Sequence, residues 1–231
     1  MPFTNRTRRP ADLTPAVALQ MLRNGNFRFV NNQRLEHNLR EQADQTRDQQ
    51  LPFAAILSCM DSRTAAELIF DQGLGDIFSI RLAGNVIMPS ILGSLEYAVA
   101  AAGSKLILVM GHTNCGAVAG AVKGVELGHL TDVLLRIQPA IDYEKAHEHE
   151  AETGDFNRNV SKRNAILNAQ RVYDESEIIR ELVDKGEVSV VPAMYDLYSG
   201  VVHFYPPVES VPRQSAKKVS KAAVPVADAA A

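Results

Sequence analysis

The stretch "FAAILSCMDSR", residues 53–63, begins as a continuous apolar run and ends in a cysteine, an acid and a base. Such a run is typical of a strand buried on both faces, as in a parallel sheet. Cys59, Asp61 and Arg63 lie two residues apart, so in an extended chain their side chains point to the same side. The stretch therefore predicts a buried strand that delivers a thiol, a carboxylate and a guanidinium to one place.

A second buried strand is predicted at "KLILVM", residues 105–110, and the turn "GHTNCG" follows it with His112 and Cys115. Parallel sheets place ligands at the carboxyl ends of their strands. Cys59 also follows a strand, so the two loops can converge on one point if the two strands are neighbours.

The rest of the chain alternates between strand and helix patterns, which favours an α/β fold with a mainly parallel sheet. Thr14 and Pro15 are a typical helix start, and residues 31–51 are polar enough for a loop or an exposed helix. Further helices are predicted at 64–73, 90–103, roughly 130–150 and 159–185, and Gly73 is expected to end the first of them. A further strand is predicted at 76–81. The segments "EVSVVPAMYD" and "VVHFY" are predicted to form a terminal hairpin with its turn at "LYSG".

Length, charge and cysteine content exclude several classes of protein. The 231 residues fit one sizeable α/β domain, and a net charge of −3 with a pI near 6.1 argues against a nucleic-acid-binding role. No apolar run approaches the roughly 18 residues that span a bilayer, and the N-terminus does not resemble a secretory signal, so we expect a cytoplasmic protein with no membrane partner. Two cysteines are too few for the disulfide framework of a small secreted fold.

Cys59, His112 and Cys115 form a soft ligand set that suits Zn²⁺ better than calcium or magnesium. Structural zinc sites use four Cys or His ligands, whereas catalytic sites use three and keep one position open. The chain has no third cysteine to close the site. The fourth position is therefore left to water, to substrate or to a carboxylate.

Asp61 is the candidate carboxylate, and Arg63 can keep it away from the metal. A guanidinium holds a carboxylate through two parallel hydrogen bonds. Held in this way, Asp61 can accept a proton from a zinc-bound water, whose pKa zinc can lower to about 7. The sequence thus predicts a metal ligand, a proton acceptor and a clamp for that acceptor within one short stretch.

"CMDSR" and "GHTNCGAV" together resemble the signature of the β-class carbonic anhydrases, Cys-x-Asp-x-Arg followed about fifty residues later by His-x-x-Cys. The likeness covers roughly residues 14–205, so residues 1–205 are expected to form one domain of this kind with an N-terminal helical arm at 14–50. The tail at 206–231 lies outside it and is expected to be disordered. Further matching stretches are "TPAVALQMLRNGNFRFV", "RLAGN", "SLEYAV" and "MYDLYSG".

The resemblance implies a parallel four-stranded sheet with an added edge strand, flanked by helices. It also implies a homodimer or dimer of dimers, in which the N-terminal arm embraces the partner and the active site lies at the dimer interface. Cys59, His112 and Cys115 would hold zinc, Asp61 and Arg63 would form a catalytic pair, and Asp61 would become the fourth ligand in a closed state. The reaction would be the reversible hydration of carbon dioxide to bicarbonate and a proton, by attack of zinc-bound hydroxide, with no organic cofactor.

Two further sites of the family can be compared with this sequence. Arg81 matches the arginine of an inhibitory bicarbonate site, but the tryptophan of that site falls at Ile56, so we do not expect the site in its usual form. The narrow substrate-binding pocket of the plant-like members is matched by Gln50, Phe78, Ala83, Tyr97 and Gly116.

Two alternative functions remain open at this point: hydrolysis of carbonyl sulfide or carbon disulfide at the same zinc site, and a zinc-stabilised scaffold without catalysis. The intact pair of Asp61 and Arg63 argues against the scaffold. The stretch "AHEHEAE", 146–152, is interpreted as a solvated helix face rather than a metal site, and His203, in an apolar strand, is expected to be packed.

Overall fold

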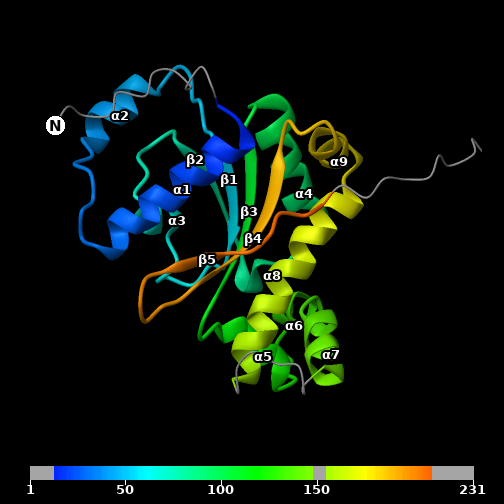
Figure 1. Ribbon diagram of the computed structural model, residues 1–231. Helices are drawn as coiled ribbons and strands as arrows, with labels where there is room; N and C mark the ends of the chain where they lie inside the picture. Colours follow the sequence, from blue (N-terminus) through cyan, green and yellow to red (C-terminus); the bar gives the residue numbers. More distant parts are fainter. Residues whose placement is uncertain (1–12, 148–154, 210–231) are drawn as a thin grey trace, which may run out of the picture.

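A sheet runs through the middle of the computed structural model, which describes residues 13–147 and 155–209 (Figure 1). The strands of these residues lie in the order β2-β1-β3-β4-β5. The first four pair in parallel, and β5 pairs with β4 in the antiparallel direction at one edge. This confirms the predicted mainly parallel sheet with an added edge strand. The strands are β1 (Ala54–Ser58), β2 (Ile77–Arg81), β3 (Leu106–His112), β4 (Ser189–Tyr195) and β5 (Val202–Phe204).

The register of β1 and β3 brings the two motif-bearing loops together. Ser58, the last residue of β1, pairs with Met110, so the two strands end almost level. Cys59 directly follows β1, while β3 continues two residues beyond the predicted end and includes His112. The condition that the two strands be neighbours is therefore met.

Helices cover both faces of the sheet and one of its ends (Figure 1). One face packs against α1 and α3, and the other packs against α4, α8 and α9. A third apolar cluster, formed with α5, α6 and α7, lies at the carboxyl end of the strands and includes both cysteines. The helices are α1 (Pro15–Val30), α2 (Leu39–Gln45), α3 (Ala66–Ile69), α4 (Pro89–Glu96), α5 (Gly116–Val122), α6 (Leu130–Leu135), α7 (Gln138–Ala146), α8 (Phe156–Glu175) and α9 (Glu177–Asp184).

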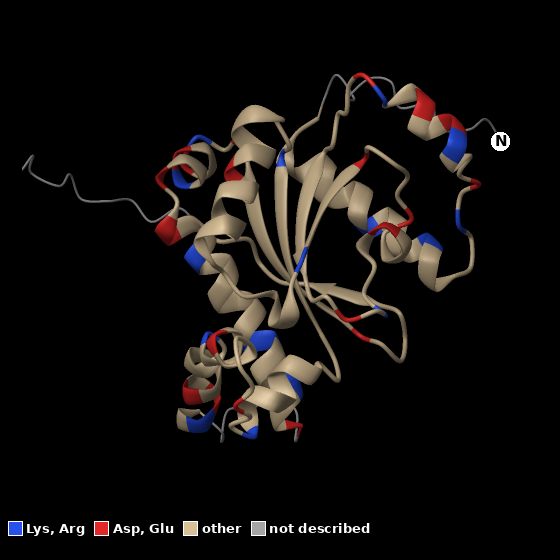
Figure 2. Cartoon of the chain, turned by 180° about the vertical axis from the view of Figure 1, so that it is seen from behind, with Lys and Arg blue, Asp and Glu red and all other residues tan. Residues whose placement is uncertain are grey.

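The strands carry few charged side chains, as expected of a sheet that is buried between helices. Figure 2 shows that the strands carry almost no charged side chains, whereas Lys, Arg, Asp and Glu lie on the helices and loops. All residues of β1 and β3 are buried, as their continuous apolar runs predicted. None of the helices in the described part of the chain is long and apolar enough to cross a membrane.

Several helix ends differ from the prediction. The segment predicted at 159–185 is divided at Ser176, whose hydroxyl caps α9 by accepting a hydrogen bond from the amide of Ile179 at 3.2 Å. The segment predicted at 130–150 is likewise divided into α6 and α7. The helix at 90–103 is present as α4 followed by a π-helical turn, Tyr97–Ala101. The acidic and histidine-rich stretch lies outside the described residues from position 148 onward.

The helix predicted to end at Gly73 ends earlier because Asp71 has another role. α3 stops at Ile69, and Asp71 takes a positive φ of 48°. Its buried carboxylate accepts hydrogen bonds from the Arg28 side chain and from the amide of Leu35, and Oδ1 lies 3.3 Å from Nε2 of His37. A side chain just beyond α3 thereby fixes the segment that leaves α1.

The prediction that His203 is packed in the core is wrong. β5 is an edge strand in which Val202 is buried and His203 is exposed. Because successive side chains of a strand point to opposite faces, burial of Val202 turns His203 outward.

Candidate metal centre

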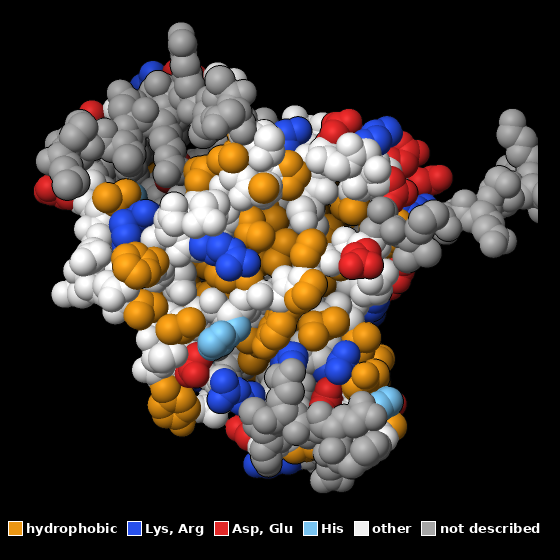
Figure 3. Space-filling model, viewed as in Figure 1, with side chains coloured by type: hydrophobic (Ala, Val, Ile, Leu, Met, Phe, Trp, Pro, Cys, Tyr) orange, Lys and Arg blue, Asp and Glu red, His pale blue; other side chains and the backbone are white. Residues whose placement is uncertain are grey.

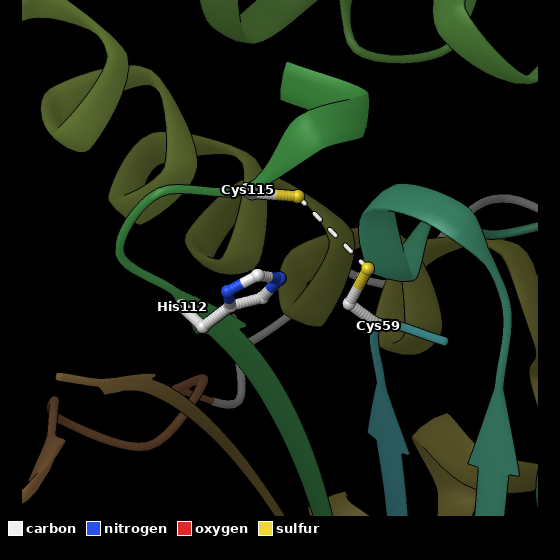
Figure 4. A group of neighbouring side chains, drawn as sticks. All are labelled: Cys59, His112 and Cys115. Atoms are coloured by element: carbon white, nitrogen blue, oxygen red, sulfur yellow. Dashed lines mark hydrogen bonds between the residues drawn. The ribbon is translucent and has the colours of Figure 1, made fainter. Parts of the chain in front are cut away.

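Three ligand-bearing side chains meet at the carboxyl ends of β1 and β3 (Figure 4). The side-chain ligand atoms of Cys59, His112 and Cys115 all lie within 4.8 Å of one another, and all three residues are buried. The two sulfur atoms are 3.9 Å apart. Two sulfurs bound tetrahedrally to one zinc ion at about 2.3 Å would lie about 3.8 Å apart. The spacing therefore fits a shared metal ion.

The imidazole of His112 is oriented by a hydrogen bond within the turn after β3. Nδ1 lies 2.8 Å from the carbonyl oxygen of Thr113, which can only accept, so Nδ1 carries the proton. Nε2 is then left with its lone pair, and in the described structure it is buried without a hydrogen-bond partner. A buried nitrogen that has a free lone pair and lies beside the thiols of Cys59 and Cys115 has the chemistry of a metal ligand.

The surroundings of the two sulfurs favour a thiolate at Cys59. The hydrogen bond from the Cys115 thiol, together with the backbone N–H groups of Asp61 and Gly84, outweighs burial and lowers the pKa of Cys59 far below its usual value. The Cys59 thiolate and burial in turn raise the pKa of Cys115. The pair thus loses its first proton readily at Cys59, which prepares the site for a cation because thiolates, not thiols, bind metals.

Gly84 can approach Cys59 because of its backbone conformation. It has a φ of +69°, which L side chains rarely adopt, and a Cβ here would lie 2.8 Å from Cδ1 of Ile137. The positive φ of this turn therefore favours the glycine in "RLAGN".

Asp61 is held by Arg63 through both carboxylate oxygens. Nε of Arg63 donates to Oδ1 at 2.9 Å and Nη2 donates to Oδ2 at 2.8 Å. The amide of Arg63 also donates to Oδ1 at 2.9 Å. These hydrogen bonds outweigh partial burial and keep the pKa of Asp61 well below its usual range, so the carboxylate is ionised. Its oxygens are not part of the cluster of three ligand atoms.

Arg81 plays a part at this site that the sequence did not suggest. Its guanidinium donates to the carbonyl oxygens of Cys59, at 3.2 Å, and of Asp61. It therefore fixes the backbone of the loop that carries both the first ligand and the carboxylate. The only sign of this role was the position of Arg81 at the end of β2. That position lies level with Ser58 only because β2 is the neighbour of β1, which the sequence does not show.

The residues predicted to bind substrate do not all gather around this cluster. Ala83 and Gly116 are adjacent in sequence to Gly84 and Cys115 and so lie beside it. Phe78 and Tyr97 form an edge-to-face pair with ring centroids 6.0 Å apart.

Gln50, by contrast, is separated from the cluster by a whole strand. It precedes β1 while Cys59 follows it, so about 16 Å of strand lies between them in the same chain. The assignment of these five residues to a substrate pocket therefore stays a prediction.

Known proteins are similar to this chain over most of its length. The model of the carbonic anhydrase family matches residues 54–202. Carbonic anhydrase 2 of Mycobacterium tuberculosis (strain CDC 1551 / Oshkosh) is 37% identical over 209 residues, which cover 80% of this chain and 90% of that protein.

Solved structures of similar fold give the same picture. The β-carbonic anhydrase CcaA is 25% identical and has a TM-score of 0.67, and the match covers 83% of this chain and 93% of that one. One of two tetrameric β-carbonic anhydrases from the ascomycete Sordaria macrospora has a TM-score of 0.63 at 23% identity, covering 71% of this chain and 89% of that one. At that identity the second match shows the fold alone.

Proposed function

Since this chain belongs to the β-class carbonic anhydrases and is an enzyme of that family, we propose that it uses one zinc ion, held by Cys59, His112 and Cys115, to interconvert carbon dioxide and bicarbonate. The observation that carries the proposal is the cluster of three buried ligand atoms within 4.8 Å of one another. Among the described residues no fourth ligand joins the cluster, so one position of a tetrahedral ion would be left open.

The ion would supply Lewis acidity, which makes water acidic enough to lose a proton near neutral pH. Asp61 would accept a hydrogen bond from that water, and this role is supported by its ionised carboxylate and by its position two residues after Cys59. Arg63 keeps the carboxylate in position through two side-chain hydrogen bonds. Arg81 holds the backbone of the same loop, so attacking water and proton acceptor would keep a fixed relation to the metal.

We further propose that two copies of the chain complete each site. Gln50 and Cys59 lie at opposite ends of β1, so one chain alone does not bring the predicted amide donor to its own metal. Large apolar side chains are exposed on the protomer, among them Phe27, Leu68 and Tyr97, at 62%, 58% and 57%. Figure 3 shows hydrophobic side chains gathered in the middle of one face. Large apolar side chains that gather on one exposed face are typical of a subunit interface, and the Sordaria relative is tetrameric.

The proposal is tested by stopped-flow carbon dioxide hydration combined with metal analysis, on the wild type and on Cys115→Ser. We expect one zinc per wild-type chain and rapid hydration, and loss of both in the variant. A wild type that binds zinc without hydrating carbon dioxide at any pH would contradict the proposed reaction. Measuring the rate of carbonyl sulfide hydrolysis in the same way compares the alternative substrate with carbon dioxide directly.

A further inference from the structure

The turn between β4 and β5, residues 196–201, is hydrogen-bonded to the turn that carries two of the proposed metal ligands. β3 and β4 end level, because His112 pairs with Tyr195. The next residue, Thr113, donates its backbone N–H to the carbonyl oxygen of Tyr195 at 3.0 Å. Its hydroxyl oxygen accepts a hydrogen bond from the amide of Leu197, 84 residues away in the sequence, also at 3.0 Å. Thr113 is therefore held at two points by the end of β4 and the turn that follows it.

These two contacts determine where the carbonyl group of Thr113 points. Its oxygen lies 2.8 Å from Nδ1 of His112. Since a carbonyl oxygen can only accept, it fixes the proton on Nδ1 and leaves the lone pair of Nε2 for a metal ion. Thr113 is only 5% exposed, and its β-branched side chain has few rotamers. A shift of its hydroxyl group would therefore be transmitted to the imidazole.

The turn between β4 and β5 is itself fixed by several contacts. Oδ1 and the backbone carbonyl oxygen of Asp196 accept hydrogen bonds from the amides of Tyr198 and Gly200, each at 2.8 Å. From α1, the side-chain amide of Asn26 donates to the carbonyl oxygen of Gly200 at 2.9 Å. The side chain of Leu197 packs against the core cluster between α1 and the sheet. The amide of Leu197 is thus a donor with a fixed position.

Asn114 provides a second link between the two turns. It lies between His112 and Cys115 and has a positive φ of 55°, which Asn tolerates better than most residues. Its side-chain amide donates to the hydroxyl oxygen of Tyr198 at 3.1 Å. Because the side chain of Tyr198 is 85% exposed, water competes for this hydrogen bond, and we expect it to be the weaker of the two links.

We propose that Thr113 is a positioning residue of the metal centre. The amide of Leu197 holds its hydroxyl group so that its carbonyl keeps the imidazole of His112 in the orientation that binds zinc. This inference rests on the proposed function, because it takes His112 as a zinc ligand. If Thr113 served the fold alone, it would satisfy the amide of Leu197 without any influence on the metal.

The test is the zinc affinity of the full-length protein, measured by competition with a chelator, for Thr113→Val and Thr113→Ser. Valine keeps the shape of threonine but cannot accept the hydrogen bond from Leu197, whereas serine keeps the hydroxyl group. Removal of a group that orients a metal ligand typically weakens metal binding about 10–100-fold. We expect a loss of this size in Thr113→Val and near wild-type affinity in Thr113→Ser.

The matched control is Thr131→Val. The hydroxyl oxygen of Thr131 accepts from the amide of Leu127 at 2.9 Å, so this substitution removes the same kind of hydrogen bond in a turn that carries no proposed ligand. It should bind zinc as the wild type does. Cobalt(II) substitution adds a spectroscopic readout that a role in folding alone would not move. The visible absorption bands should shift in Thr113→Val but not in Thr113→Ser or in the control.

If Thr113→Val does not fold, Tyr198→Phe decides, because it changes an exposed side chain and removes only the acceptor of Asn114. We expect zinc release from this variant to be about two- to ten-fold faster, the scale of one neutral hydrogen bond. An unchanged rate of release would then overturn the proposal.

If Thr113→Val folds, the proposal is overturned when it binds zinc as tightly as the wild type, or when Thr113→Ser or Thr131→Val loses as much affinity. A wild type that binds no zinc would contradict the proposed function itself, so the two failures are distinguishable.

Discussion

The side-chain amide of Asn164 donates a 2.8 Å hydrogen bond to the carbonyl oxygen of Gly84, whose own N–H faces the sulfur of Cys59. Asn164 is buried in the middle of α8, only 2% exposed. The Oδ1 atom of Asn164 accepts in turn a hydrogen bond from the side-chain amide of Asn168 at 2.9 Å. A helix on one side of the sheet thereby fixes the backbone donor that stabilises a thiolate at the carboxyl end of β1.

Replacing this amide should weaken metal binding. Asn164→Ala leaves the Gly84 carbonyl without its buried donor and frees the turn to move away from Cys59. Groups that orient metal ligands typically change metal affinity by about 10–100-fold. We expect a loss of this size when zinc affinity is measured by competition with a chelator.

The control for this prediction is Asn157→Ala, the same substitution at an exposed position of the same helix. It should leave zinc affinity unchanged. An Asn164→Ala protein that folds and binds zinc as tightly as the control would show that the amide only supports the fold.

Asp61→Asn should separate metal binding from catalysis. The amide cannot accept the proton of water as a carboxylate does, while the three ligands are untouched. We expect full zinc content and at least about a hundred-fold loss of kcat for hydration, the usual scale of a lost general base. Asp48→Asn, which breaks an exposed ion pair with Arg47, should keep normal turnover. Near wild-type kcat in Asp61→Asn would remove the assigned role.

Complementation between two inactive chains tests whether each site draws on two copies. Gln50→Ala should keep the metal but lose the predicted amide donor, whereas Cys115→Ser should keep the donor but lose the metal. In dimers formed at random from equal amounts, roughly a quarter of the sites would combine an intact metal and an intact donor. Co-expression should therefore restore about that fraction of activity.

The matched control for complementation is co-expression of Cys59→Ser with Cys115→Ser. Each variant lacks one of the three proposed ligands, and all three come from the same chain, so no mixed dimer regains a complete site. Recovery in this pair, or its absence in the first, would argue against a shared site.

Asp71→Asn should destabilise the fold in a pH-dependent way. Burial alone would raise the pKa of Asp71, but hydrogen bonds from Arg28 and Leu35 outweigh it, and the folded pKa lies below its usual value. The stabilisation is therefore present above the unfolded pKa of about 3.9 and is lost as the pH falls through the folded pKa. We expect a loss of about 2–4 kcal/mol at pH 7.

Urea unfolding at pH 7 and pH 3 measures this effect. The difference between the wild type and Asp71→Asn should shrink at the lower pH, because the carboxylate of the unfolded wild type, with a pKa of about 3.9, has then taken up its proton while the folded pKa is lower. Asp44→Asn, at an exposed ion pair with Arg40, should change stability by less than about 0.5 kcal/mol. An equal difference at both pH values would contradict the assignment to ionised Asp71.

Much of the sheet could be predicted because its strands are buried on both faces. The continuous apolar runs at 53–58 and 105–110 leave little choice of structure, and their ends place the proposed metal ligands. Helix ends were less predictable, since they depend on tertiary contacts. Asp71 ends α3 because it pairs with Arg28, 43 residues away, and no local pattern indicates that partner.

The candidate ligands could be predicted from residue type and spacing, but their supports could not. Arg81 and Asn164 act on the site through backbone carbonyls that come close only when β2 and α8 take their places. An isolated arginine or asparagine in a sequence carries no sign of such a contact. His203 was misjudged because an apolar neighbourhood in sequence does not show that β5 is an edge strand.

X-ray absorption spectroscopy of the zinc-loaded protein tests the central claim most directly, because it reads the ligands of the ion itself. A single metal bound by Cys59, His112 and Cys115 predicts two sulfur neighbours at about 2.3 Å and one or two nitrogen or oxygen neighbours at about 2.0–2.1 Å. A first shell with four sulfurs, or with none, would contradict it.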